Sequence, residues 1–432
     1  MFSFLQSEKS KLRQGAKQWL YLGKKVYNFR KDELNDSELS ELSSSIEQLK
    51  VQLSSKGSDN SKMKAAIDKM ESIMREVGGS FFPRTSMGEN VDFFFMALII
   101  YLGFTAFFVK PFKIPTNSMW PTYHGMTAEV WTDDEETPSA PARLARLAAF
   151  GAVRYEFRAP ADGEFTIPVY REAGNGLSRR PEVVTKRKYF VIPGKGWRHT
   201  FAVGGEVGSV TVPLDFQLDS QVLLPAFFPD APDLNSALNG LSVVDRRFEQ
   251  VRGQDGSTRN IEAVYFGTGR TYKKGDLVFA FDILTGDQLF VDRMSYHFVS
   301  PKTGDGFVFR TGNIPRLKGE GDKFYIKRLA GLPGDVLQIE EGGLIVNGKP
   351  AEGSIAFDLN ATQADPYRGY VNSGNLASGR TLEIPEDSYY ALGDNSNNSK
   401  DGRNWGFVPE GDVIGKPFLI YYPFTSRFGL AK

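Results

Sequence analysis

The chain has 432 residues, and its 52 lysine and arginine residues balance its 52 aspartate and glutamate residues. A net charge of zero gives no electrostatic reason to expect nucleic acid as a partner. The absence of cysteine excludes disulfides, thiolate-bound zinc and a cysteine nucleophile. The three histidines, His124, His199 and His297, lack metal-ligand spacing, so we expect neither a metal nor another cofactor.

The first 91 residues predict a helical region. Residues 1–31 are basic with interleaved aromatic and aliphatic residues, which leaves two interpretations open: an amphipathic segment on an anionic membrane surface, or a soluble basic helix. Apolar residues then recur every three to four positions from Leu34 to Leu53 and again from Met63 to Met74. This period predicts two helices joined by a short polar loop.

Residues 93–109 form the most hydrophobic segment and carry no charge. As a helix they would span roughly 26 Å, near the short limit for crossing a bilayer. We predict a transmembrane helix over residues 92–110, with a buried core helix as the alternative. Basic residues lie on both sides of the segment, so charge alone does not fix its orientation.

A single serine, Ser118, follows this segment between an Ile-Pro step and a Met-Trp-Pro-Thr step. Pro115 and Pro121 disfavour helix on both sides of it, so we expect Ser118 on an extended, exposed turn. Such a serine could be a nucleophile, but most serines in this setting are ordinary turn residues. This stretch alone therefore does not identify an enzyme.

Two later stretches bear on the same question. Residues 324–335 predict a strand that ends in a Gly-Pro-Gly-Asp turn and carries Lys327 among apolar neighbours. Lysine can act as a base only when it is neutral, and burial would lower its pKa. The residues alone leave a second interpretation open, in which Lys327 is an exposed strand residue that alternates with buried neighbours. Residues 393–406 predict a long polar loop after a strand at residues 389–392.

The remaining sequence predicts mainly β structure. From Gly286 to the end, short strands are separated by Gly-Asp turns, which is typical of an antiparallel domain. Residues 352–380 are polar and predict a peripheral loop or small excursion. Residues 127–284 contain short strand candidates bounded by glycine, proline and aspartate, at residues 155–158, 165–167, 189–192 and 210–212.

The three stretches around Ser118, Lys327 and residues 393–406 together resemble those of type I signal peptidases, the membrane-anchored Ser-Lys endopeptidases that remove signal peptides from exported proteins. The resemblance implies a catalytic β domain made of residues 111–126 and 285–432. In that family a Gly-Asp-x-Leu-Phe-Val strand closely follows the serine motif, whereas here it begins at Gly286. Residues 127–284 are therefore expected to be a β-rich insertion.

The resemblance also implies the roles of individual residues. Ser118 attacks the scissile carbonyl and neutral Lys327 accepts its proton. The oxyanion is held by the Ser118 backbone N–H and the Thr116 hydroxyl. Ser399 matches the hydroxyl that orients the lysine.

Asp401 and Arg403 match an acid–base pair that braces the loop. Three loop positions depart from the family pattern and put the support of the loop in doubt: Ser396, Asn397 and Gly402.

An extended signal peptide is expected to add as a β-strand between two walls and to be selected for small residues in an Ala-x-Ala pattern. The residues expected to line these walls are Phe112, Ile114 and Pro115 on one side and Tyr325 and Ile326 on the other.

The resemblance implies a location in the inner membrane, with one or a few spans, the catalytic domain on the outer (periplasmic) face and residues 1–91 in the cytoplasm. The expected partners are signal peptides of secreted preproteins and the lipid bilayer, with export-machinery contact through the N-terminal helices or the insertion. Two alternatives stay open: another Ser-Lys protease, such as a self-cleaving repressor-type peptidase, or a membrane-anchored scaffold with an inactive peptidase domain.

Overall fold

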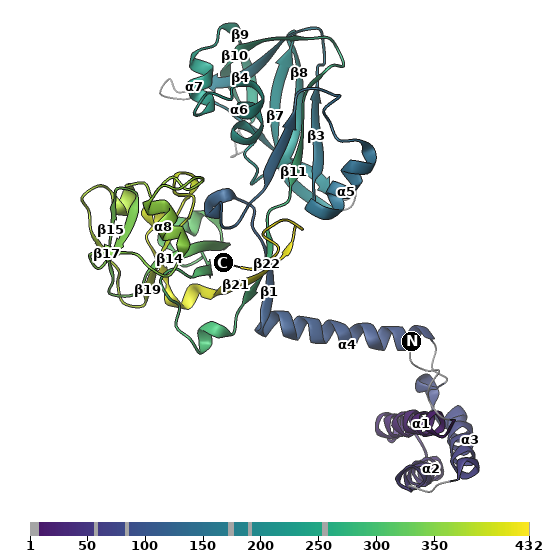
Figure 1. Ribbon diagram of the computed structural model, residues 1–432. Helices are drawn as coiled ribbons and strands as arrows, with labels where there is room; N and C mark the ends of the chain where they lie inside the picture. Colours follow the sequence, from purple (N-terminus) through teal and green to yellow (C-terminus); the bar gives the residue numbers. More distant parts are fainter. Residues whose placement is uncertain are drawn as a thin grey trace. The chain divides into compact units, whose positions relative to one another are not determined.

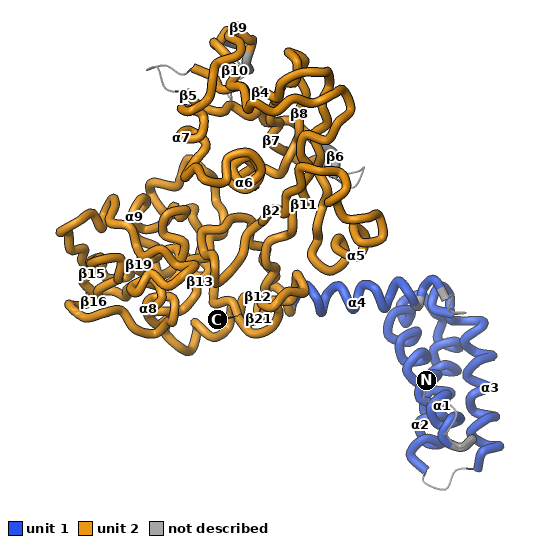
Figure 2. The backbone as a smooth tube through the Cα atoms, turned by 45° about the horizontal axis from the view of Figure 1, so that its top comes forward, with its two compact units in different colours: residues 1–103 blue, residues 104–432 orange. Residues whose placement is uncertain are grey.

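The computed structural model describes residues 8–55, 59–82, 86–171, 177–188, 192–252 and 258–431. The chain divides into two compact units, residues 1–103 and residues 104–432 (Figure 2). The helices of the described residues are α1 (Glu8–Arg30), α2 (Asp36–Ser54), α3 (Asn60–Val77), α4 (Ser86–Phe107), α5 (Ala140–Phe150), α6 (Leu224–Phe227), α7 (Leu234–Asn239), α8 (Ile355–Ala361) and α9 (Gly402–Trp405).

The first unit contains a bundle of α1, α2 and α3 (Figure 1). Helix α2 begins at a capping box in which the Asn35 side chain and the Glu38 side chain each accept a backbone N–H of the other residue. Ala16 and Val26 of α1 are fully buried in the bundle core with Met70 of α3. One side of α1 is thus used within the bundle, whereas Tyr21 and Phe29 are exposed, so both interpretations of residues 1–31 stay predictions.

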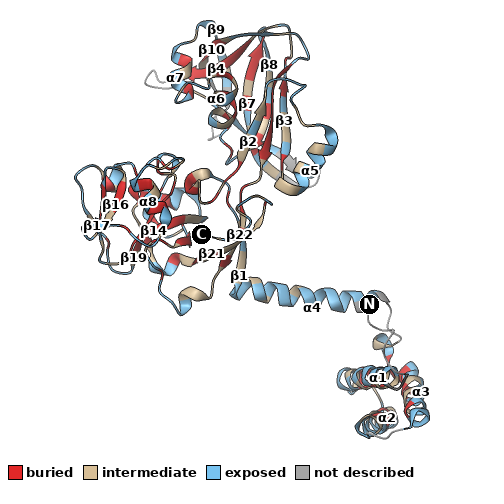
Figure 3. Cartoon of the chain, viewed as in Figure 1, coloured by how far each residue is buried: buried red, intermediate tan, exposed pale blue. Residues whose placement is uncertain are grey.

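Helix α4 differs from the bundle because its apolar side chains are exposed (Figure 3). Its segment Asn90–Phe107 has a mean hydropathy of 1.7 and is 0% buried, and it is the one helix of the described residues that is long and apolar enough to cross a membrane. This exposure contradicts the alternative of a buried core helix. The helix ends at Phe107, and Val109 and Lys110 already belong to strand β1, so it stops before the predicted limit at residue 110.

The second unit contains an antiparallel sheet in which β1, β12, β21, β13, β14, β19 and β20 follow one another, with β22 paired to β21. Every pairing is antiparallel, which confirms the predicted mainly antiparallel β domain. The bounds of these strands are β1 (Val109–Lys113), β12 (Gln288–Asp292), β13 (Gly306–Arg310), β14 (Phe324–Gly331), β19 (Ser388–Leu392), β20 (Phe407–Pro409), β21 (Val413–Tyr422) and β22 (Gly429–Leu430).

A smaller four-stranded sheet is built from β15 (Val336–Glu340), β16 (Gly343–Val346), β17 (Lys349–Pro350) and β18 (Leu382–Glu383). Helix α8 packs against it, with Phe357, Tyr370 and Leu376 buried in the shared core. The predicted small excursion at residues 352–380 is present between β17 and β18, but it is not merely peripheral, because it contributes these side chains to the core. Its few apolar residues are too widely spaced to give a periodic signal, yet they reach the core.

Residues 127–284 form two further sheets. One is three-stranded, β2 (Thr127–Trp131), β11 (Leu277–Leu284) and β3 (Val153–Arg158), and the other orders β6, β7, β4, β10 and β9, with β5 paired to β4 and β8 to β7. The bounds in the second sheet are β4 (Gly163–Arg171), β5 (Leu177–Ser178), β6 (Glu182–Lys188), β7 (Ile192–Val203), β8 (Glu206–Pro213), β9 (Val243–Arg252) and β10 (Thr258–Tyr272).

The predicted strands at residues 155–158, 165–167 and 210–212 lie within β3, β4 and β8. Of the candidate at residues 189–192, the first three residues lie outside the described residues and Ile192 begins β7.

The insertion begins and ends side by side. Thr127 of β2 pairs with Leu284 of β11, so the chain leaves and rejoins the catalytic sheet at one place. Asp287 stabilises the place where the chain rejoins the sheet. Its backbone carbonyl accepts the Ile114 N–H, and its backbone N–H donates to the His124 carbonyl. Its carboxylate accepts the His124 N–H and pairs with Arg427. The serine segment and β12 are thus held together although the insertion separates them in sequence.

A buried ion pair joins β14 to the loop after β19. Arg328 Nε and Nη2 donate to the two carboxylate oxygens of Asp394 at 3.1 and 2.5 Å, and both side chains are almost fully buried. Thr122 Oγ1 donates to Asp394 Oδ2 at 2.6 Å, and Arg328 Nη1 donates to the Gly304 carbonyl at 2.9 Å. Four chain segments therefore meet at this pair, because those of Thr122 and Gly304 join the two that carry Arg328 and Asp394.

We expect Asp394→Ala to lower the free energy of unfolding by about 3–5 kcal/mol, because it leaves the Arg328 guanidinium buried without a counter-charge. Urea unfolding of the purified chain in detergent, followed by tryptophan fluorescence, measures the change. The matched control is Asp365→Ala, because Asp365 also pairs with an arginine, Arg368, but its side chain is 87% exposed. Equal effects of the two substitutions would contradict this account of the buried pair.

Candidate active site

Ser118 lies in a short 3-10 helix, Asn117–Met119, between β1 and β2. Its residue is only 8% exposed, so the prediction of an extended, exposed turn was wrong. Pro115 and Pro121 restrict their own backbone and that of the residue before each of them. They therefore leave the residues between them free to form one helical turn.

The Asn117 side chain closes this segment into a loop. Its Nδ2 donates to the Met126 carbonyl at 3.0 Å, and its Oδ1 accepts the Gly125 N–H at 2.8 Å. A Cβ at position 125 would lie 2.3 Å from the Thr116 carbonyl carbon, so only glycine fits where the two ends of the loop meet. The loop holds Ser118 on the side that faces β14.

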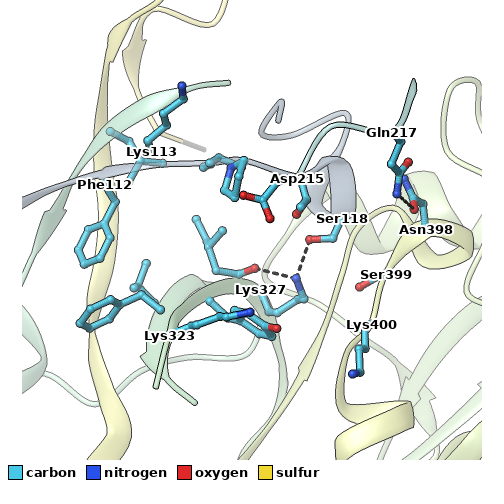
Figure 4. Close-up of a pocket in the computed structure, with 18 of the residues that line it drawn as sticks. Phe112, Lys113, Ser118, Asp215, Gln217, Lys323, Lys327, Asn398, Ser399 and Lys400 are labelled. Carbon is cyan, nitrogen blue, oxygen red and sulfur yellow. Dashed lines mark hydrogen bonds between the residues drawn. The ribbon is translucent and has the colours of Figure 1, made fainter. Parts of the chain in front are cut away.

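Lys327 extends from β14 to the serine (Figure 4). Its Nζ donates to Ser118 Oγ at 2.6 Å and to the Ile326 carbonyl at 3.1 Å. The residue is 5% exposed, which contradicts the alternative of an exposed strand lysine. Burial lowers the pKa of Lys327 to about 8, against the opposing influence of the negative charges of Asp401 and Asp394.

Ser399 is not placed as predicted. It lines the same cavity, but its buried Oγ makes no hydrogen bond within the described residues. Lys327 is instead oriented by the carbonyl of Ile326, its own neighbour in the strand. The Ser399 hydroxyl lies against Gly393, where an added Cβ would be only 2.1 Å from it.

Asp401 and Arg403 form the predicted ion pair at 2.8 Å, with both side chains buried. Asp401 Oδ2 also accepts the Gly393 N–H at 3.0 Å, so the pair fixes the start of the loop. Ser396 contributes to the same network, because its Oγ and carbonyl accept from Arg403 at 2.5 and 2.7 Å. The doubt raised by Ser396 is thereby resolved, since its short side chain supports the loop through Arg403.

A cavity of about 700 Å³ surrounds the two side chains. All the residues predicted as substrate walls line it, and so does Thr116: Phe112, Ile114, Pro115, Thr116, Tyr325 and Ile326. Asn397, which is exposed, also lines it. None of the three histidines is among the lining residues, and no group of three acidic or histidine side chains in the described ranges could hold a metal.

Among the lining residues that sequence reasoning missed, Asp215 and Gln217 belong to the insertion. Their local signal is weak: both are exposed polar residues next to the buried Phe216 and Leu218. That alternation indicates which side of the segment faces outward. It does not indicate which distant part of the chain lies opposite.

Comparisons with known proteins match this chain to signal peptidases. A sequence model described as "Signal peptidase, peptidase S26" matches residues 280–422. The "Signal peptidase I P" of Bacillus subtilis subsp. natto is 33% identical over 144 residues, which cover 33% of this chain and 70% of the relative. The matched range of the family model contains Lys327 but not Ser118, so the structure alone brings the serine to the lysine.

A "Probable signal peptidase I-2" from Synechocystis sp. is 35% identical over 144 residues, 33% of this chain. The match spans 58% of that relative, less than two thirds of its length. The solved structure of a signal peptidase I from Enterococcus faecalis matches 27% of this chain and 97% of its own, with 24% identity and a TM-score of 0.21.

Gly402 is the remaining departure from the expected loop pattern, and its surroundings explain it. A Cβ at this position would lie 2.8 Å from Tyr390 Cζ and 2.9 Å from the Ala391 carbonyl oxygen. Both neighbours belong to strand β19, and Tyr390 is fully buried. The close approach of α9 to β19 therefore leaves no space for a side chain.

We expect Gly402→Ser to lower the free energy of unfolding by about 1–3 kcal/mol, because the added atoms overpack the contact with Tyr390. Urea unfolding measures the change. The matched control is Gly411→Ser, where a Cβ would meet nothing within 4 Å. A Gly402→Ser chain as stable as the Gly411→Ser control would contradict the overpacking.

Proposed function

The chain belongs to the signal peptidase I family, and we propose that it is a membrane-anchored serine endopeptidase that cleaves N-terminal signal peptides from exported precursor proteins. The observation that carries this proposal is the 2.6 Å contact between Lys327 Nζ and Ser118 Oγ inside a cavity. A serine hydroxyl needs a base to become a nucleophile, and the buried lysine is the base within reach.

In the proposed mechanism, neutral Lys327 takes the proton of Ser118 as Oγ attacks the scissile carbonyl. The Ser118 N–H and the Thr116 hydroxyl hold the oxyanion, and each such donor is worth roughly 10²–10³ in rate. Collapse of the intermediate breaks the peptide bond, and protonated Lys327 gives its proton to the departing amine. Lys327 then activates the water that hydrolyses the acyl-enzyme and regenerates Ser118.

The substrate would bind as an extended strand between β1 and β14. Strand β1 lies at the end of the sheet order, and β14 pairs with β19 only from Arg328 onward. The segment Phe324–Lys327 therefore has an edge that is not paired with β19. A peptide that adds to these edges gains backbone hydrogen bonds, and shallow apolar walls would select small side chains.

The membrane topology is part of the proposal. Exposed α4 would anchor the chain in the inner membrane as a single span or one of a few, with the catalytic domain on the periplasmic face and residues 1–91 in the cytoplasm. The N-terminal bundle or the insertion would then be available to the export machinery. Loop residues Asp401 and Arg403 would act by positioning the site, and Ser399 would face the substrate rather than orient the lysine.

We expect Ser118→Ala and Lys327→Met each to abolish cleavage of a synthetic precursor with an Ala-x-Ala site, because each removes one half of the nucleophile–base pair. The assay uses purified full-length chain in detergent and identifies the cut by mass spectrometry. Ser378→Ala and Lys302→Met, at exposed positions away from the cavity, are the matched controls. A wild-type chain that is folded but inert on several precursors would favour the scaffold alternative.

The pH dependence of kcat/KM tests the base. The pKa of Lys327 is depressed from 10.5 to about 8, so the neutral fraction, and with it the rate, should rise as pH increases through about 8. Measurements from pH 6 to 10 cover this limb. A rate that keeps rising tenfold per pH unit to pH 10 would mean that Lys327 is not desolvated in the working enzyme.

A further inference from the structure

The insertion contributes to the cavity that contains Ser118 and Lys327. Asp215 and Gln217 line it, and both belong to the short segment after β8, residues 214–218 (Figure 4). In the close-up the Asp215 carboxylate points into the cavity, and Gln217 lies beside Asn398. The cavity therefore has a wall that is not made by the catalytic sheet.

This segment is held firmly on the insertion. Phe216 and Leu218 are buried in the insertion core, and the Phe216 ring stacks on Phe281 of β11 at 5.9 Å with an interplanar angle of 5°. Trp197 Nε1 donates to the Leu214 carbonyl at 2.8 Å. Since Phe216 and Leu218 point inward, Asp215 is directed away from the core and toward the cavity.

One hydrogen bond and one electrostatic effect place the segment relative to the catalytic residues. Gln217 Nε2 donates to Asn398 Oδ1 at 3.4 Å, which joins the insertion to the loop that carries Ser399. Burial raises the pKa of Tyr325 to about 12, and the negative charges of Glu320 and Asp215 add to this rise. Asp215 is thus close enough to Tyr325 to act on the part of the cavity between β1 and β14.

We propose that residues 214–218 form a third wall of the peptide groove and that Asp215 is a specificity-determining residue for the charge of the substrate upstream of the scissile bond. This inference rests on the proposed function, because it assigns the bound peptide to the space between β1 and β14. The recognised substrate class is a precursor with a basic or neutral residue at the position that faces Asp215.

Asp215 is opposite in charge to the other charged residues that line the cavity. Among its described lining residues Asp215 is the one acid, whereas three lysines besides Lys327 also line it: Lys113, Lys323 and Lys400. Lys400 is paired with Glu320 outside the lining set. Removing the Asp215 charge therefore leaves the described lining of the cavity without an acid. Because Asp215 is exposed, we expect a modest effect of about two- to fivefold in rate rather than a complete loss.

The test measures kcat/KM for a set of synthetic precursors. Each precursor carries lysine, glutamate or glutamine at one position, and the positions tested run from the second to the sixth residue before the scissile bond. For each position the ratio of the lysine to the glutamate precursor is compared between wild type and Asp215 variants. At one or more positions we expect Asp215→Asn to lower this ratio about two- to fivefold and Asp215→Lys to lower it further. The change should shrink at high salt, where exposed charges are screened.

Asp230→Asn and Asp230→Lys are the matched controls, because Asp230 is an exposed aspartate of the insertion that does not line the cavity. The glutamine precursors report basal activity without a substrate charge. Normal cleavage of these precursors with unchanged ratios in both Asp215 variants would overturn the inference and leave the proposed function standing. Failure of wild type to cleave any precursor would overturn the proposed function itself.

Discussion

The structure depends on the burial of one ammonium group, that of Lys327. Desolvation lowers its pKa, whereas the carboxylates of Asp401 and Asp394 act in the opposite direction. Each carboxylate has its own arginine partner, Arg403 or Arg328, so its charge is largely engaged elsewhere. The buried ion pairs thus fix the surrounding loops while they allow the lysine to become neutral, which an unpaired carboxylate beside it would prevent.

Sequence reasoning identified the candidate pair because Ser118 and Lys327 occur in stretches with a recognisable order and composition. It also predicted an antiparallel sheet, since Gly-Asp turns between short apolar runs are a local signal. It failed where the outcome depends on packing between distant segments. Three features depend on which distant segment lies opposite, which no local pattern encodes: the helical turn at Ser118, the Ser399 hydroxyl without a hydrogen bond to any described residue, and Asp215 in the cavity wall.

The departures from the family pattern have local physical reasons. The close approach of α9 to Tyr390 explains the glycine at position 402. Ser396 accepts two hydrogen bonds from the Arg403 guanidinium. The loop is therefore supported by a set of contacts that suits its own neighbours. The predicted domain boundaries at residues 91, 110, 126 and 284 stay predictions, although strand pairing gives the last two a structural basis.

The pairing of Thr127 with Leu284 has a consequence for folding. If the insertion were a flexible loop, closing it to join the serine segment to β12 would carry a large entropic penalty. A folded insertion presents its two ends side by side and behaves as a short connection, which lowers that penalty by roughly 3 kcal/mol. Folding of the insertion therefore favours assembly of the two separated parts of the catalytic sheet.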